Sequence, residues 1–430
     1  MPEVIAQPDR RKMKRLIFGI KSVFLRLVRS PFLQKMLQLF VNIAVHFVKV
    51  DKHLVICGAM NGKLYGDNSK YVYEWILEQN KPSHAVWVTR NKNVYRELKR
   101  QGRPVVLSTS LSGVLCVLRA RVGIFTNSLY DLAILPSLIP QRVSLIALRH
   151  GRSVKRIRFA RQMHMISDLE KHDRLFESKL IRYAISTSDM ISSMQEECLQ
   201  IGRDKHIVTG YPRNDLLNTC TTEDMSIWTD FIGNKVRDSK VILYAPSWRH
   251  GREATKFFPF DDFDTSLLVD FLEKQNIVLL LRPHMNDLFK YPDLVRFLSG
   301  LCEKSVHIRL AGHDVLADVN TILPFADMLI SDYSALYHDY LLLDRPMLFV
   351  PYDYDEFSQQ NGFLYDYKAL LPGPWLTSMS EFFTAVNSVV EGNDTHKVQR
   401  HRLKQMIHQY DDVNSRERVY KLIEQVQGLV

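Results

Sequence analysis

The chain has 430 residues, of which 46% are hydrophobic and 24% charged. This length and balance predict a soluble globular protein with two α/β domains rather than one. Five cysteines are scattered without a Cys-x-x-Cys pair, which argues against a zinc site or a disulfide framework and suits a reducing cytoplasm.

The net charge of +10 is concentrated near the amino terminus. Residues 1–30 hold eight basic and two acidic side chains, a net charge of +6, so the other 400 residues carry only +4. A nucleic-acid enzyme more often spreads its basic surface over the folded body. We therefore expect no nucleic-acid partner.

Residues 13–29 predict a basic amphipathic helix, because apolar side chains recur at helical spacing with lysines and arginines at their border. After Pro31, a second apolar stretch runs from Met36 to Val48. It is too short and too polar for a bilayer span of roughly 20 apolar residues, and no signal-peptide cleavage site follows. We expect residues 1–50 to lie peripherally on an anionic membrane, at its cytoplasmic face. The alternative is a helix pair packed on the protein itself.

From Leu54 onward, short apolar runs alternate with helical segments. The expected strands are residues 54–57, 85–89, 105–107, 122–126, 143–148 and 181–186, and the expected helices are residues 71–79, 94–101 and 189–200. This alternation predicts a parallel sheet with helices on both faces.

The strand over residues 143–148 leads into His150 and Gly151, followed by a basic cluster that includes Arg152 and Lys155. Parallel sheets of this kind place their sites beyond the carboxyl ends of strands. His150 is therefore a candidate functional residue, although a lone histidine in a loop is more often structural.

A rigid turn, Gly210–Asp215, precedes the expected interdomain hinge before Ser239. The second domain restarts the alternation with strands over residues 241–245 and 277–281. The first of these strands is followed by Arg249, and the second by Arg282 and His284.

Residues 318–351 predict a strand, a polar turn, a helix and a second strand, which is a βαβ unit. The turn is Ser331-Asp332-Tyr333-Ser334, and Ser334 stands at the expected helix N-cap. Helix dipole and unpaired N–H groups favour an anion such as phosphate. Together with the cations after the two preceding strands, the turn outlines an anion pocket; an ordinary Ser-capped helix is the alternative.

The rest of the chain predicts a loop and closing helices over residues 380–390 and 395–426. Asp353 and Asp355 have the spacing of a metal-binding pair, but in a loop we expect them to be solvated. No metal site is expected, and the need for a divalent cation stays open.

Nine motifs together resemble the CDP-glycerol glycerophosphotransferase family, whose enzymes prime or polymerise teichoic acids and related capsule polymers. They follow the family's order between about residues 55 and 380. The motifs are Gly62–Asn68, His150–Gly151 with Lys155, Ser186–Asp189, Gly210–Asp215, Tyr244–Arg249, Arg282–His284, residues 318–351, Gly362–Phe363 and Leu371–Pro374.

The resemblance implies an α/β fold of two facing Rossmann-like domains, of the glycosyltransferase-B type. Residues 51–215 would form the acceptor domain, residues 216–392 the CDP-donor domain, and residues 393–430 a closing helix. It also implies the reaction: an acceptor hydroxyl attacks the β-phosphorus of CDP-glycerol, CMP leaves and a phosphodiester forms. No cofactor is expected beyond this donor substrate, and the acceptor would be lipid-linked or oligomeric.

Physical grounds give roles to the residues singled out above, and the resemblance supports the role of His150. His150 would be the general base and His284 a second catalytic residue that steadies the diphosphate. The expected donor-diphosphate contacts are Arg249, Arg282, Asp332, Ser334 and Ala335. The expected acceptor or phosphate contacts are Gly151, Arg152, Lys155 and Arg213.

Three departures from the family pattern leave the donor open between CDP-glycerol, CDP-ribitol and another CDP-linked compound. Ala335 stands where the family often has a second serine, Asn361 where it often has arginine, and Arg152-Ser153 where it tends to have small or apolar residues. A nucleotide-sugar glycosyltransferase of the same fold is the alternative enzyme, and a non-catalytic membrane scaffold is the alternative of a different class.

Overall fold

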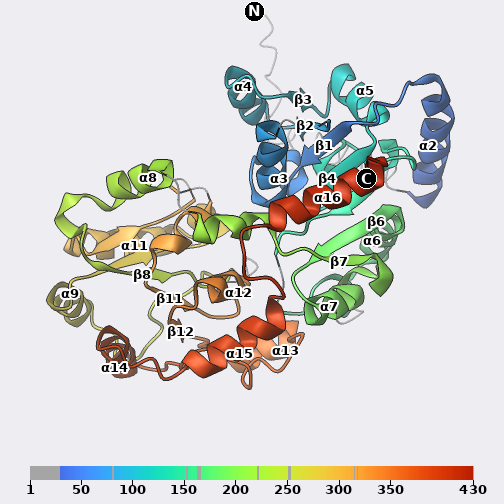
Figure 1. The fold of residues 1–430 in the computed structure, drawn as a ribbon. Coiled ribbons are helices and arrows are strands. Elements are labelled where there is room, and N and C mark those ends of the chain that lie inside the picture. Colours follow the sequence, from blue (N-terminus) through green and yellow to red (C-terminus); the bar gives the residue numbers. More distant parts are fainter. Residues whose placement is uncertain are drawn as a thin grey trace, which may run out of the picture. The chain divides into compact units, whose positions relative to one another are not determined.

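The computed structural model describes residues 30–79, 82–151, 154–161, 166–219, 222–249, 253–313, 315–316 and 318–429 (Figure 1). The predicted helix over residues 13–29 lies outside these residues, and so does Arg152. The chain forms two compact units. Unit 1 consists of Met1–Tyr65, Lys81–Ile146 and Met163–Arg182, and unit 2 of Gly66–Asn80, Ala147–Gln162 and Tyr183–Val430.

The first sheet has seven strands in the order β3-β2-β1-β4-β5-β6-β7. They are β1 (Leu54–Gly58), β2 (His84–Thr89), β3 (Val105–Leu107), β4 (Val122–Phe125), β5 (Ser144–Ala147), β6 (Ile181–Ser186) and β7 (His206–Val208). Parallel pairing joins β1 to β2 and β4, β2 to β3, and β6 to β7. The six predicted strands are confirmed to within one residue at each end, whereas β7 was not predicted.

The helices that follow these strands are α3 (Asp67–Glu78), α4 (Lys92–Arg100), α5 (Leu111–Arg119), α6 (Asp168–Leu180) and α7 (Asp189–Leu199). Every residue of β1, β4 and β5 is buried. Such burial is typical of parallel strands that are covered on both faces.

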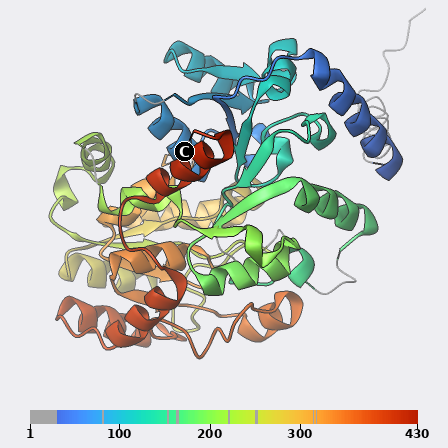
Figure 2. The same cartoon turned by 45° about the vertical axis from the view of Figure 1, so that its right-hand side comes forward.

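The second sheet lies within unit 2 and has five strands in the order β10-β9-β8-β11-β12, all paired in parallel (Figures 1 and 2). They are β8 (Lys240–Tyr244), β9 (Ile277–Leu281), β10 (Ile308–Leu310), β11 (Met328–Ser331) and β12 (Met347–Phe349). The accompanying helices are α8 (Thr222–Ile232), α9 (Thr265–Lys274), α10 (Met285–Lys290), α11 (Pro292–Lys304), α12 (Leu336–Tyr340), α13 (Tyr354–Asn361) and α14 (Met379–Val390).

Apolar clusters cover both faces of this sheet. Val278 and Leu280 of β9 belong to one cluster, whereas Ile277, Leu279 and Leu281 belong to the other. Because side chains alternate along a strand, the two clusters mark its two faces. Two parallel sheets with helices on their faces confirm the predicted α/β class.

The helix after β11 begins later than predicted. Ala335, not Ser334, is the N-cap of α12, and Ala335 already has helical backbone angles. The Ser334 hydroxyl still accepts a hydrogen bond from the N–H of Leu336, at 3.3 Å. The preceding turn is held by buried contacts of Asp332, so the chain enters the helix only after that turn is complete.

The predicted closing helix over residues 395–426 is two helices, α15 (Lys397–Ile407) and α16 (Ser415–Gln427), both red in Figure 1. The break has a tertiary cause. The carboxylate of Asp215 accepts hydrogen bonds from the N–H groups of Ser415 (3.0 Å) and Arg416 (2.9 Å). N–H groups in the first turn of a helix have no acceptor within the helix itself. Asp215 supplies that acceptor and therefore caps α16 from a distant part of the sequence.

Helix α2 (Pro31–Ala44) in unit 1 turns polar side chains inward and apolar ones outward. Gln34 and Gln38 are buried, and their amides donate to Asp173 (2.9 Å) and to the carbonyl of Ile139 (2.8 Å). The exposed apolar side chains on α2 and just after it are Phe32, Leu33, Met36, Leu39, Phe40, Ile43 and Phe47. No helix of the described part of the chain is long and apolar enough to span a bilayer.

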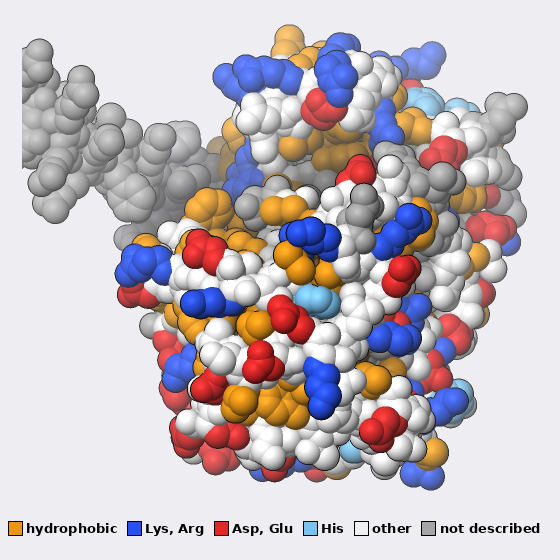
Figure 3. Space-filling model, turned by 90° about the vertical axis from the view of Figure 1, so that its left-hand side faces the viewer, with side chains coloured by type: hydrophobic (Ala, Val, Ile, Leu, Met, Phe, Trp, Pro, Cys, Tyr) orange, Lys and Arg blue, Asp and Glu red, His pale blue; other side chains and the backbone are white. Residues whose placement is uncertain are grey.

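Charged side chains of both signs are interspersed on the face drawn in Figure 3. Within unit 1, helix α4 differs from this mixed pattern. Its basic residues Lys92, Arg96, Lys99 and Arg100 are exposed, with Glu97 as its acidic residue. Unit 1 therefore presents a local basic surface.

Candidate functional site

Three neighbouring strands of the second sheet end at the predicted donor residues. In the order β9-β8-β11, these strands lead to Arg282–His284, to Ser247–Arg249 and to Ser331–Ser334. The strands are parallel, so their carboxyl ends share one edge of the sheet. This edge is where the sequence places the anion pocket.

Arg249 is buried at this edge, with 5% of its surface exposed, and it binds two carboxylates. Its Nε and Nη2 donate to the two oxygens of Asp353 at 2.7 and 2.9 Å, and its Nη1 donates to Asp332 at 2.7 Å. Burial lowers the pKa of Arg249, but the charge of Asp332 outweighs this and raises it. The guanidinium is therefore a buried ion-pair centre, not the open cation that the sequence predicts, and Asp353 is its partner instead of a solvated carboxylate.

Asp332 joins the ends of β8 and β11. One carboxylate oxygen accepts from the N–H of Ser247 at 2.8 Å, and the other from Arg249. A carboxylate also repels a diphosphate. In the structure the Asp332 carboxylate holds the turn that carries Ser334, and its direct contact with a diphosphate stays a prediction.

His284 is exposed and caps helix α10, since its Nδ1 accepts from the N–H of Asn286 at 3.2 Å. With Nδ1 as acceptor, the neutral ring carries its proton on Nε2. Although part of the ring is exposed, desolvation by the groups packed around it, followed by the charges of Lys155 and His150, lowers the pKa of His284 to about 4. At neutral pH the ring is therefore an uncharged hydrogen-bond donor. It also stacks on Trp248, with ring centroids 5.1 Å apart.

Arg282 holds the loop after β10. Its Nη1 donates to the carbonyl oxygens of Ala311 (2.8 Å) and Leu316 (2.9 Å). Burial lowers the pKa of Arg282 to about 10, which leaves the side chain charged at neutral pH.

Lys155 reaches the same region through backbone pairing. Residues 154–156 run antiparallel to residues 362–364, with the N–H of Arg156 bonded to the carbonyl of Gly362 at 3.1 Å. Two of the predicted motifs therefore form one structure. Burial lowers the pKa of Lys155 to about 8, opposed by the charge of Asp332 and reinforced by that of Arg249.

His150 is paired with Asp67 at the start of α3. Its Nδ1 lies within hydrogen-bonding distance of Asp67 Oδ2, and 59% of the imidazole is exposed, against 5% of the carboxylate. The charge of Asp67 raises the pKa of His150. Burial raises the pKa of Asp67, but the charges of His150 and Arg213 outweigh it and lower that pKa to about 2.

Gly151 allows Arg213 to approach this pair. The Arg213 Nη1 donates to Asp67 Oδ1 and to the carbonyl of His150, each at 3.1 Å. A Cβ added to Gly151 would lie 2.7 Å from Arg213 Nη2, and its φ of +111° is one that L residues rarely adopt. The His-Gly motif therefore needs glycine next to the histidine.

Asn68 ties the same segments together. Its side-chain amide donates to the carbonyl oxygens of Leu148 (3.1 Å) and Arg149 (2.8 Å) and accepts from the N–H of Arg213 at 3.0 Å. Asp67 and Arg149 both have left-handed backbone angles, with φ of +60° and +59°. Such conformations cost roughly 1–3 kcal/mol each and persist where surrounding contacts enforce them.

The structure thus forms two groups of predicted site residues. One group is His150, Gly151 and Arg213, and the other is Lys155 with the donor-edge residues Arg249 and Asp332. It gives Arg213 buried carboxylate partners, whereas the sequence predicts a ligand contact. Reasoning from the sequence missed the roles of Asp67 and Asp339, which accepts from Arg213 Nη2 at 2.6 Å. Asp67 stands in the Gly62–Asn68 motif, so a signal for it was present, whereas Asp339 lies in an ordinary helical pattern.

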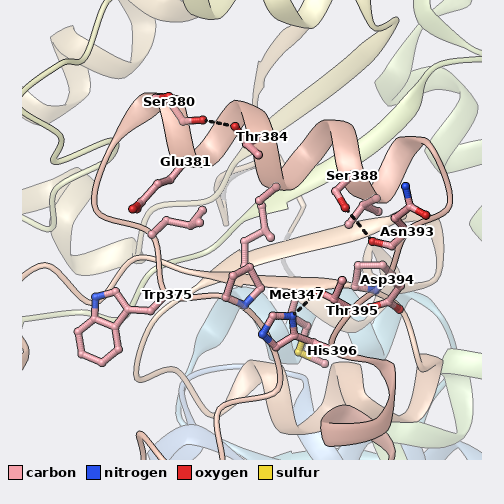
Figure 4. A pocket seen from close by; sticks show the side chains of 16 residues that line it. Met347, Trp375, Ser380, Glu381, Thr384, Ser388, Asn393, Asp394, Thr395 and His396 are labelled. Carbon is pink, nitrogen blue, oxygen red and sulfur yellow. Dashed lines mark hydrogen bonds between the residues drawn. The ribbon is translucent and has the colours of Figure 1, made fainter.

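Cavities flank the donor edge. One of about 480 Å³ is lined by Tyr352, Asp353 and Lys368, and one of about 250 Å³ by Arg249, Asp353 and Phe357. A third, of about 410 Å³, lies between β12, α14 and residues 393–396 and contains none of the predicted site residues (Figure 4). Among the described residues, no three His, Cys, Asp or Glu side chains are grouped so that they could hold a metal ion.

Comparisons with known proteins agree with this fold. The chain is 27% identical over 387 residues to the teichoic acid poly(glycerol phosphate) polymerase of Bacillus subtilis (strain 168), covering 88% of this chain and 49% of that protein. It therefore spans about half the length of that relative. It is also 27% identical over 358 residues to the teichoic acid glycerol-phosphate transferase of Staphylococcus aureus (strain NCTC 8325 / PS 47), covering 79% and 85%.

Among solved structures, that of the wall teichoic acid polymerase TagF matches with a TM-score of 0.71 and 20% identity, covering 98% of this chain and 99% of that one. This match supports the predicted glycosyltransferase-B type of fold. The family model for CDP-glycerol:poly(glycerophosphate) glycerophosphotransferase matches residues 39–425. The chain therefore belongs to the CDP-glycerol:poly(glycerophosphate) glycerophosphotransferase family.

Proposed function

We propose that the protein transfers glycerol phosphate from CDP-glycerol to a hydroxyl group of an acceptor and releases CMP, in the synthesis of a teichoic-acid-like or capsule polymer. The observation that carries this proposal is the presentation of His150 by a buried carboxylate within a chain whose family match spans residues 39–425. An exposed imidazole on a fixed support is suited to taking a proton from a hydroxyl.

In the proposed reaction, the acceptor oxygen attacks the β-phosphorus of the donor and its proton passes to Nε2 of His150. The bond between this phosphorus and the CMP oxygen then breaks. His284 donates from Nε2 to the diphosphate, and Arg282 and Lys155 balance its growing charge. Fixed donors and cations of this kind stabilise phosphoryl transfer because they need no rearrangement during the reaction.

The turn after β11 would hold the donor diphosphate through the Ser334 hydroxyl and the backbone at Ala335. The buried ion pair between Arg249 and Asp332 holds this turn in place. We place the donor on residues 216–392 and the acceptor on residues 51–215. Glycerol is the proposed polyol, and ribitol or another CDP-linked group is the alternative that the three departures from the family pattern leave open.

The acceptor is proposed to be a lipid-linked or oligomeric polyol phosphate. Each phosphodiester of such an oligomer carries one negative charge, which matches the exposed cations of α4. We also propose that the protein binds peripherally to an anionic membrane at its cytoplasmic face. The outward apolar side chains of α2 and the basic sequence of residues 1–30 support this location.

The test is a CMP-release assay with CDP-glycerol and a glycerol-phosphate oligomer as acceptor. We expect release by the wild type, loss of about 100-fold or more in His150→Ala, and no change in His401→Ala, an exposed histidine on α15. Turnover with a nucleotide sugar but not with CDP-glycerol or CDP-ribitol would instead identify a glycosyltransferase. Full activity of His150→Ala would point to another base, and a wild type that turns over none of these donors would favour a non-catalytic scaffold.

A further inference from the structure

A continuous set of hydrogen bonds within unit 2 links the proposed base to helix α12. His150 bonds to Asp67, and Arg213 bonds to Asp67 through Nη1 and to Asp339 through Nη2. Asp339 lies on α12, directly after the turn that carries Ser334, and its second oxygen accepts from Asn214 at 3.0 Å. Arg213, Asn214 and Asp339 are buried.

We propose that Asp67 is the positioning residue of the base and that Arg213, held by Asp339, fixes this pair to α12. The proposal rests on the proposed function, because it assigns the support of that same site. During transfer, the proton of the acceptor hydroxyl moves to Nε2 of His150 as the new O–P bond forms, while Asp67 stays ionised beside the imidazolium.

The hydrogen bond explains how Asp67 prepares His150. When Nδ1–H donates to the carboxylate, the neutral ring has its lone pair on Nε2, the exposed side that must accept the proton. The carboxylate then stabilises the imidazolium that results. The groups that influence His150 electrostatically are Asp67 on α3, Arg213 after β7, Arg149 on its own segment, and His284.

Arg213 explains why the carboxylate stays ionised and in place. A buried carboxylate with no cation beside it tends to take up a proton. The planar guanidinium contacts Asp67 and Asp339 at once, which the single ammonium group of a lysine cannot reproduce with the same geometry.

The main experiment compares Asp67→Asn with the wild type by the rate of CMP release between pH 5.5 and 9. Asparagine has a similar size and tolerates the left-handed backbone at this position. We expect kcat to fall by about 100-fold or more with KM for CDP-glycerol unchanged, since proton transfer by a positioned base contributes about 10²–10⁴-fold. The acid limb of the pH profile should also move to lower pH, because the charge that raises the pKa of His150 is gone.

Asp394→Asn is the matched control. There Arg400 is buried and binds two carboxylates, Asp394 at 2.6 Å and Asp344 at 2.9 Å, so the variant also removes one charge from a buried arginine. We expect its melting temperature to fall while its pH profile and kcat stay at the wild-type values. A purely structural role for Asp67 predicts the same behaviour in both variants and would overturn the proposal.

Combined variants test whether Asp67 acts through His150. We expect the double variant Asp67→Asn, His150→Ala to be no slower than His150→Ala alone, because the support has nothing left to position. Arg213→Lys should lower kcat in the wild type and add little loss to Asp67→Asn. Additive losses in these pairs would contradict the proposal.

A titration of His150 by NMR separates this proposal from the proposed function. The His150 signal is identified by its loss in His150→Ala, and its pKa should be lower in Asp67→Asn than in the wild type. If the wild type releases no CMP but the pKa of His150 still falls in Asp67→Asn, the proposed activity is refuted and the proposed pairing of Asp67 with His150 stands. Unchanged His150 titration in an active enzyme would refute the pair alone.

Discussion

His150 owes its geometry to residues far away along the chain. Asp67 lies 83 positions before it and Arg213 lies 63 positions after it, yet both contact the histidine or its backbone. Three short motifs that look independent in the sequence therefore form one hydrogen-bonded structure. The contacts explain the residue types. An aspartate accepts from the imidazole, a glycine leaves space for the arginine, and the arginine binds two carboxylates at once.

Gly151→Ala tests the space requirement. The new methyl group would meet Arg213 Nη2 at 2.7 Å in a backbone conformation with φ of +111°. We expect about 1–3 kcal/mol lower unfolding free energy and a loss of CMP release through the displaced arginine. Gly392→Ala is the control, since that glycine has φ of +87° and nothing within 4 Å of the added atom. It should lose stability but keep its activity, and equal activity losses in the two variants would contradict this account.

The neutral form of His284 leads to a second residue-scale prediction. Asparagine can replace Nδ1 as the cap acceptor for Asn286 but lacks the Nε2 donor, whereas glutamine places an N–H near Nε2. We expect kcat to fall by about 10²–10³-fold in His284→Asn and less in His284→Gln, as measured by CMP release. Since its pKa is lowered to about 4, His284 should add no ionisation to the wild-type pH profile above pH 5. The opposite order of the two variants would exclude the donor role.

At the scale of elements, tertiary contacts set the helix boundaries that the sequence pattern misplaces. Asp215 starts α16 in the middle of a predicted helix, and the tethered turn at Asp332 delays the start of α12. The strands were easier to predict, since each apolar run is bounded by polar or turn-forming residues. Periodicity thus identifies the elements, and capping partners from elsewhere decide where they begin.

Helix α2 carries the element-scale prediction. Phe40 is 76% exposed among other apolar side chains of the same helix, and Leu111 on α5 is 77% exposed. If α2 lies on a membrane, Phe40→Ser should reduce binding of the full chain to anionic vesicles by roughly tenfold, because burying one such side chain contributes about 1.5–3 kcal/mol. Leu111→Ser should have little effect in the same sedimentation assay. Equal effects would argue against a specific membrane face on α2.

For the whole molecule, the buried pair at Asp67 predicts how stability depends on pH. Its folded pKa of about 2 lies below the ordinary value of 3.8, so its contribution is present above about pH 4 and is lost as the pH falls through 2. The shift corresponds to about 2 kcal/mol. In urea unfolding, the free-energy difference between the wild type and Asp67→Asn should therefore shrink by about this amount between pH 6 and pH 2. A difference that stays constant with pH would rule out the charge as its cause.

The sequence by itself determined the α/β class, nearly all strands and the family resemblance, and it singled out His150 and His284 as candidate catalytic residues. These depend on local periodicity and on short motifs, which a single chain displays directly. It also identified Arg249, Arg213 and Asp332 as functional candidates, but it could not say which of them are buried.

Only the tertiary structure decided what those polar residues contact. The sequence predicts ligand contacts for Arg249 and Arg213, and in the structure each is enclosed with two carboxylates that lie far from it along the chain. A charged side chain can be buried only where folding brings such a partner to it. The physical reason for the difference is therefore distance along the chain: periodicity is local, whereas the pairing of buried charges is set by the completed fold.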